Sequence, residues 1–155
     1  MKKAFFLVCI IAAVAGSCTK DYPDPVVTPD KNTWIVNEKT YGPTNFVYYD
    51  TAGLMFGRTP KGDEVTVRFR WKPKADGKYV LREKADEIDE MSISVYDSAS
   101  KMTWVSTDDD GRAMKVEQFA DITVSGTNVG VSFNNLFLKR IDNIDKAKVS
   151  VNIGY

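Results

Sequence analysis

Beyond the first 32 residues, hydrophobic and polar side chains alternate along short segments of the chain. The clearest segment, "EVTVRFRW" at 64–71, carries Val65, Val67, Phe69 and Trp71 on one face. Successive side chains of a β-strand point to opposite faces of its sheet, so this period of two predicts a half-buried strand with Trp71 in the core. Alternation recurs strongly at 78–82, 91–97, 101–107 and 148–155, and more weakly at 33–36, 45–49 and 53–57.

Turn-forming pairs separate these segments. Asp76-Gly77 is expected to join 64–71 to 78–82 as a hairpin, and Gly126-Thr127 suits the two-residue loop of a second hairpin. Residues 84–90 fit a short helix. Short strands joined by tight loops predict an all-β fold, an antiparallel β-sandwich of about nine or ten strands. A flattened, lipocalin-like closed barrel is the alternative, because the alternation is the same in both.

The N-terminus has the features of an export signal. Basic residues within 1–3 precede the apolar run "AFFLVCIIAAV" at 4–14, which is too short to cross a bilayer of ~30 Å as a helix. Three small residues then lead to Cys18. This order resembles the lipobox of bacterial lipoproteins, although Ala15 stands where that family usually has Leu. The resemblance implies cleavage directly before Cys18 and attachment of a diacylglyceryl group to its thiol.

Two other interpretations stay open at this end of the chain. Cleavage after the A-x-A pattern that ends at Ala15 would leave Cys18 as a free thiol, and Cys9 is a second candidate lipid site. With lipidation at Cys18, the chain divides into a signal peptide (1–17), a lipid anchor with a Pro-rich tether (18–31) and one all-β domain (32–155). Extended polyproline geometry of ~3.1 Å per residue would let this tether hold the domain up to ~40 Å from a membrane.

A second resemblance covers most of the predicted domain. The segments "NTWIVNEKTYG" at 32–42, "DGKYVL" at 76–81 and "ITVSG" at 122–126 are similar to small lipoproteins of gut Bacteroidetes. The resemblance implies an all-β fold and lipid anchoring at the outer membrane, on the surface-exposed or the periplasmic face. That group has no settled activity, so the resemblance implies none here.

Composition narrows the function further. The chain has 21 basic and 21 acidic residues, and loss of residues 1–17 leaves 19 basic and 21 acidic residues, a formal charge of −2. Nucleic acid is therefore not an expected partner, because general nucleic-acid binding needs a basic excess. The chain has no histidine, and Cys18 is the one cysteine after processing. Ser-His-Asp and Cys-His catalysis and His/Cys zinc sites are thus excluded, and we expect neither a cofactor nor an enzyme.

Basic side chains gather on the polar face of the predicted 64–84 hairpin. The candidate ligand-binding residues are Arg68, Arg70, Lys78 and Arg82. Like charges facing each other destabilise a sheet, so either an anionic ligand or nearby acids should compensate. An acidic glycan or a phosphorylated headgroup suits the first case. Glu117 and Asp121 are the acids expected in the second.

An acidic segment resembles a calcium loop in its spacing. From Ser106 to Glu117 the chain reads S-x-D-x-D-G-x5-E, which is the EF-hand pattern with Ser in place of the first Asp. The flanks, including 112–119, are predicted as strands, whereas an EF-hand needs helices. Asp108–Asp110 are therefore expected in a hairpin turn, and the sequence leaves open whether that turn binds calcium.

Aromatic residues give a third candidate site. Trp34, Trp71 and Trp104 could stack on sugar rings, but alternation places the last two in the core.

The preferred function is accordingly a non-catalytic binding or accessory module of the cell envelope, for glycans or anionic ligands. One alternative is a protein–protein assembly module. The other is a hydrolase built on the carboxylates of 86–90, although the sequence places no opposing pair across a cleft.

Overall fold

A computed structural model of the protein describes residues 28–108, 116–142 and 144–154. Those residues form strands joined by turns, with one 3-10 turn, η1 (Asp50–Ala52). The strands are β1 (Thr33–Val36), β2 (Lys39–Tyr41), β3 (Phe46–Tyr49), β4 (Leu54–Arg58), β5 (Glu64–Phe69), β6 (Gly77–Leu81), β7 (Glu90–Asp97), β8 (Met102–Val105), β9 (Phe119–Ser125), β10 (Asn128–Arg140) and β11 (Lys146–Gly154). The helix expected at 84–90 does not form, because residues 84–89 make bends and a turn that lead into β7, which begins at Glu90.

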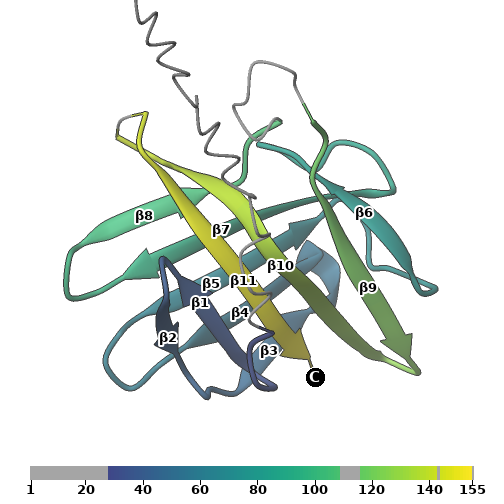
Figure 1. Ribbon diagram of the computed structural model, residues 1–155. Helices are drawn as coiled ribbons and strands as arrows, with labels where there is room; N and C mark the ends of the chain where they lie inside the picture. The colour runs from purple at the N-terminus through teal and green to yellow at the C-terminus, as the bar shows by residue number, and fades with distance from the viewer. Residues whose placement is uncertain (1–27, 109–115, 143, 155) are drawn as a thin grey trace, which may run out of the picture.

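Five strands close into a ring. The pairs are β6 with β7, β7 with β8, β8 with β10, β10 with β9, and β9 with β6. Only the β6–β7 pair is parallel among these. Two wings leave the ring: β5, β4 and β3 extend from β7, and β11, β1 and β2 extend from β10 (Figure 1).

The all-β prediction is confirmed, and the predicted sandwich needs correction. All the described strands belong to one continuous hydrogen-bonded sheet, whereas a sandwich has two separate sheets. The closed-barrel alternative applies to the five-stranded ring alone. The wings nevertheless face each other, since Trp34 of β1 meets Phe46 of β3 edge to face at 6.4 Å.

An irregularity in β10 allows the ring to close. The register of β10 against β11 shifts between Phe133 and Leu136, and Asn135 has a positive φ of 54°. Such a bulge bends a strand and re-aims it. The first part of β10 therefore pairs with β9, while Lys139 and Arg140 at its far end pair with β8.

The core follows the predicted alternation wherever a strand forms. Val65, Val67 and Phe69 of β5 are buried, as are the inward residues of β7 and β11. Trp71 is the exception, with 62% of its surface exposed. Strand β5 ends at Phe69, so the period of two no longer fixes the direction of Trp71.

One of the two predicted hairpins is confirmed. Ser125 pairs with Asn128 across the two-residue loop 126–127, where Gly126 has a φ of +63°. The prediction of a hairpin around Asp76-Gly77 is wrong, because β7 lies between β5 and β6 in the sheet. Of the strand predicted at 112–119, residues 112–115 lie outside the described part, and only Phe119 is in a strand.

Candidate binding site

The four predicted cations do not form one face. Arg68 lies on β5 opposite Ser92 of β7, whereas Lys78 lies on β6, beyond β7. Arg70 and Arg82 lie in the loops that follow β5 and β6. The insertion of β7 separates the side chains that a hairpin would have brought together.

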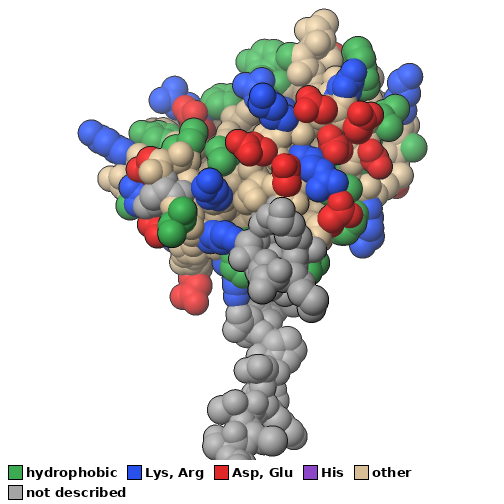
Figure 2. Space-filling model, turned by 90° about the horizontal axis from the view of Figure 1, so that it is seen from above, with side chains coloured by type: hydrophobic (Ala, Val, Ile, Leu, Met, Phe, Trp, Pro, Cys, Tyr) green, Lys and Arg blue, Asp and Glu red, His purple; other side chains and the backbone are tan. Residues whose placement is uncertain are grey.

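Two of these cations, Arg82 and Lys78, already have acidic protein partners. Arg82 forms ion pairs with Glu90 at 3.1 Å and with Glu117 at 2.7 Å, and Lys78 lies 3.8 Å from Asp121. Hydrogen bonds from Arg82 to Glu117 and then Glu90 raise the pKa of the guanidinium. The compensating acids expected at Glu117 and Asp121 are thus present. Figure 2 shows the same mixing of acidic and basic side chains on the face seen from above.

The first and last residues of the calcium-loop pattern, Ser106 and Glu117, bind other protein groups. Ser106 is buried, and its Oγ accepts a hydrogen bond from the Ile93 N–H at 2.9 Å and donates one to the Arg82 carbonyl at 2.5 Å. Glu117 is paired with Arg82. Asp109 and Asp110 lie outside the described residues, and within the described part no group of three or more acids is placed to hold a metal ion.

A hollow of about 890 Å³ lies beside Trp71, and we call it the Trp71 hollow. It is lined by residues of three segments: 50–51 in η1, 71–79 between and within β5 and β6, and 88–89 before β7. Its volume lies in the range of small-molecule binding sites.

Several contacts fix the wall formed by the loop after β5. Lys72 pairs with Asp50 at 2.7 Å, and its Nζ lies 5.3 Å from the ring centroid of Tyr48. Pro73 is buried. Asp76 Oδ1 accepts a hydrogen bond of 2.7 Å from the Val124 N–H, which ties the loop to β9.

Trp71 presents a supported aromatic surface. The Arg70 guanidinium lies over the indole at 6.0 Å from the ring centroid, and Arg70 also donates a hydrogen bond to the Asp86 carbonyl. Arg70 thus covers part of one face of the indole, and the high exposure of Trp71 leaves the rest of the ring open. The other two tryptophans, Trp34 and Trp104, are 0% and 7% exposed, so Trp71 alone is available for stacking.

Apolar and polar groups surround this ring. Ile88 is 70% exposed on one side of the Trp71 hollow, and Tyr79 packs edge to face on Phe69 at 5.7 Å. Burial, together with the nearby charge of Asp89, raises the pKa of the Tyr79 hydroxyl above its usual value, so it stays protonated at neutral pH. The Trp71 hollow therefore offers an aromatic plate with hydrogen-bonding groups around it.

Of the predicted site residues, Lys78 lines the Trp71 hollow and Arg70 supports its ring, while Arg68 and Arg82 do not line it. The prediction of Trp71 in the core is wrong, so the sequence did not predict that Trp71 lies beside this candidate site. Pro73 is the one signal of an earlier strand end, because a proline has no N–H to donate to a strand ladder.

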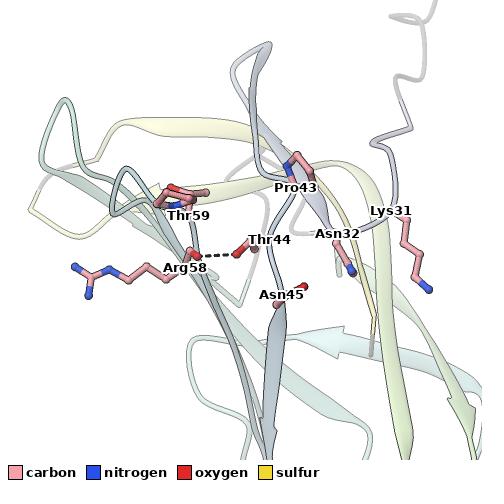
Figure 3. A pocket seen from close by; sticks show the side chains of 8 residues that line it. Lys31, Asn32, Pro43, Thr44, Asn45, Arg58 and Thr59 are labelled. Carbon is pink, nitrogen blue, oxygen red and sulfur yellow. Dashed lines mark hydrogen bonds between the residues drawn. The ribbon is translucent and has the colours of Figure 1, made fainter.

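A second hollow, of about 620 Å³, lies where the described chain begins. Thr44 donates a hydrogen bond of 2.6 Å to the Arg58 carbonyl across it (Figure 3). Figure 3 also shows the side chains of Lys31 and Arg58 on opposite sides of Asn45, with the Arg58 guanidinium directed away from it. The cations do not converge there, and among the described residues no aromatic ring lines the hollow.

Comparisons of the chain with protein-family models, with curated proteins and with solved structures find no match.

Proposed function

We propose that the chain is a cell-envelope lipoprotein whose β domain is a non-catalytic carbohydrate-binding module, with the Trp71 hollow as its binding site. The observation that carries this proposal is the open indole of Trp71 beside a hollow of small-molecule size. A sugar ring has an apolar face of C–H groups and a rim of hydroxyls. An exposed aromatic plate with charged and polar groups around it complements both.

The scaffold suits a binding role. The Trp71 hollow is built largely from the loop between β5 and β6, and β6 belongs to the five-stranded ring. We infer that this ring is the rigid support and that the loop supplies recognition, as is usual where a regular fold carries a binding site.

The proposed location in the cell envelope rests on the N-terminal sequence. An apolar run, small residues and Cys18 favour lipid attachment, and the Pro-rich segment up to residue 31 would then serve as the tether. The membrane is thus the proposed partner through the lipid, and the outer membrane is the proposed location. A tethered module of this kind would hold glycans near the cell.

A glycan array tests the proposal with the full chain purified in detergent. We expect wild-type protein to bind a subset of glycans and Trp71→Ala to bind them at least about tenfold more weakly, since aromatic stacking contributes on the order of 1 kcal/mol beyond area burial. Tyr49→Ala removes an exposed ring that does not line the Trp71 hollow and is the matched control. Equal binding by wild type and Trp71→Ala would contradict the assignment of the site.

A separate feature favours assembly with a protein as the second candidate function. Strand β3 is an edge of the sheet, and its Val47 and Tyr49 are about half exposed. An uncharged edge strand can pair with a strand of another chain. Val47→Lys should then weaken crosslinking to envelope proteins in cells without changing glycan binding.

A further inference from the structure

The charged residues that line the Trp71 hollow balance one another, and Arg70 adds one positive charge above the Trp71 ring. The lining contains three lysines, Lys72, Lys74 and Lys78, and three aspartates, Asp50, Asp76 and Asp89. The Lys72–Asp50 ion pair removes one charge of each sign from direct ligand contact. A strongly anionic ligand would lie beside carboxylates, and a cationic ligand would lie beside ammonium groups, so neither is favoured.

Two polar groups of the Trp71 hollow remain unused within the described part of the protein. The side chains of Lys74 and Asp89 make no hydrogen bond or ion pair with another described residue. One is a donor only and the other, when ionised, is an acceptor only. A hydroxyl group both donates and accepts, so neighbouring hydroxyls of one ligand can satisfy both.

The aromatic plate also limits how the ligand lies. Arg70 covers part of one face of the Trp71 indole, so a flat apolar surface stacks on the open face. Ile88 adds exposed apolar surface within the same hollow. A pyranose ring that stacks by its C–H face turns its equatorial hydroxyls outward, toward the polar rim.

From these contacts we infer that the ligand is an uncharged saccharide, stacked on the face of Trp71 opposite Arg70, with hydroxyls hydrogen-bonded to Asp89 and Lys74. The inference rests on the proposed carbohydrate-binding function and specifies the class of glycan. It replaces the acidic glycan that the basic residues of the sequence suggested, because Glu117 and Asp121 already accompany two of those residues.

Calorimetric titration of the full chain in detergent tests the inference. The probes are neutral hexasaccharides of glucose, xylose, mannose and galactose, beside hexagalacturonate and a heparin hexasaccharide. We expect one or more neutral probes to bind at least tenfold more tightly than either acidic probe. Their Kd should change less than twofold between 50 and 500 mM NaCl, because no net charge is neutralised on binding.

Two substitutions at one residue sharpen the result. Asp89→Asn keeps an acceptor oxygen and should weaken neutral binding by no more than about threefold, whereas Asp89→Ala removes the acceptor and should weaken it about tenfold. Lys61→Gln, an exposed change outside the Trp71 hollow, is the control and should leave the Kd unchanged. Circular dichroism of each variant reports whether the fold is intact.

The outcomes separate the two levels of the claim. Tighter binding of an acidic probe, with an affinity that falls as salt rises and improves in Asp89→Asn, overturns the inference and leaves carbohydrate binding in place. Absence of binding by all the probes, with a folded protein, overturns the inference, and a blank glycan array then overturns the proposed function as well.

Discussion

Asp63 shows how a single carboxylate joins two loops. It lies between β4 and β5, and its Oδ1 accepts hydrogen bonds from the N–H and the hydroxyl of Ser98, at 3.0 and 2.8 Å. Its Oδ2 accepts a bond of 3.0 Å from the Thr59 hydroxyl. Burial alone would raise the pKa of Asp63, but the bonds from Ser98 and Thr59 outweigh it and hold the pKa below its usual value.

A lowered pKa makes stability depend on pH in a defined direction. The contribution of Asp63 is present above the pKa of the unfolded chain, about 3.9, and is lost as the pH falls through the lower folded value. Asp63→Asn should therefore lower the free energy of unfolding at pH 7 by about 1–3 kcal/mol and flatten its fall below pH 4. Urea unfolding between pH 2.5 and 7 measures both effects.

Asp121→Asn is the control for this prediction. Asp121 is exposed and lies 3.8 Å from Lys78, so its loss should change the free energy of unfolding by less than about 0.5 kcal/mol. If both substitutions lowered the free energy of unfolding at pH 7 by the same amount, the hydrogen bonds to Ser98 and Thr59 would make no particular contribution to stability.

Tyr48 carries a buried hydroxyl that finds no hydrogen-bond partner among the described residues. Burial, followed by the nearby charges of Asp50 and Tyr79, raises the pKa of Tyr48 to about 12. Tyr48→Phe removes the unsatisfied group and keeps the ring, so it should raise the free energy of unfolding by about 1 kcal/mol. Thermal unfolding at pH 7 measures the change, and a loss of stability would reveal an unrecognised partner of this hydroxyl.

At the scale of elements, Gly57 shows how the wing of β3 and β4 packs. Gly57 pairs with Phe46 across the two strands, and a Cβ at this position would lie 2.5 Å from the Phe46 ring. Phe46 is itself buried against Trp34, so the ring has little room to move. Gly57→Ala should lower the free energy of unfolding by about 1–3 kcal/mol through overpacking.

Two further variants isolate this cause. In a Phe46→Leu background the cost of Gly57→Ala should shrink, which a double-mutant cycle of urea unfolding detects. Gly77→Ala is the matched control in β6, where the nearest atom to an added Cβ is 3.9 Å away. Its free energy of unfolding should be unchanged. A cost of Gly57→Ala that persists without the Phe46 ring would place the strain elsewhere.

The local alternation of hydrophobic and polar residues predicted many of the strands but little of the order in which they lie in the sheet. Val65, Val67 and Phe69 are buried as expected, because alternation along one strand reflects burial of one face. The position of β7 between β5 and β6 could not be predicted. It depends on parallel pairing of β6 with β7, in which Leu81 lies opposite Met91, and turn residues predict only antiparallel hairpins. Short-range signals therefore identify strands, and long-range pairing arranges them.

The candidate site was predictable to a similar extent. Of the predicted ligand-binding residues, Lys78 lines the candidate Trp71 hollow and Arg68 and Arg82 do not. Trp71 is predicted in the core because the alternation of β5 continues in the sequence to residue 71, whereas the strand ends at Phe69. Which aromatic ring is exposed depends on where one strand stops, and the end of an element is its least certain feature in a sequence.

At the scale of the whole molecule, the proposed lipid decides where the domain works. Among the described residues no helix has the length and hydropathy to span a membrane. If Cys18 carries the lipid, Cys18→Ser should move the protein from the membrane fraction to the soluble fraction. Mass spectrometry of the wild-type N-terminal peptide should show a diacylglyceryl group on Cys18. Cys9→Ser is the control, and membrane retention of Cys18→Ser would refute this anchor.

The most direct test of the central claim is an NMR titration of the ¹⁵N-labelled full chain in detergent. The chain has three tryptophans and so three indole N–H signals, and Trp71→Phe identifies the signal of Trp71. On addition of the neutral hexasaccharides, the Trp71 signal should shift saturably, while those of the buried Trp34 and Trp104 stay in place. Saturable binding of a saccharide that leaves the Trp71 signal unmoved would contradict the account.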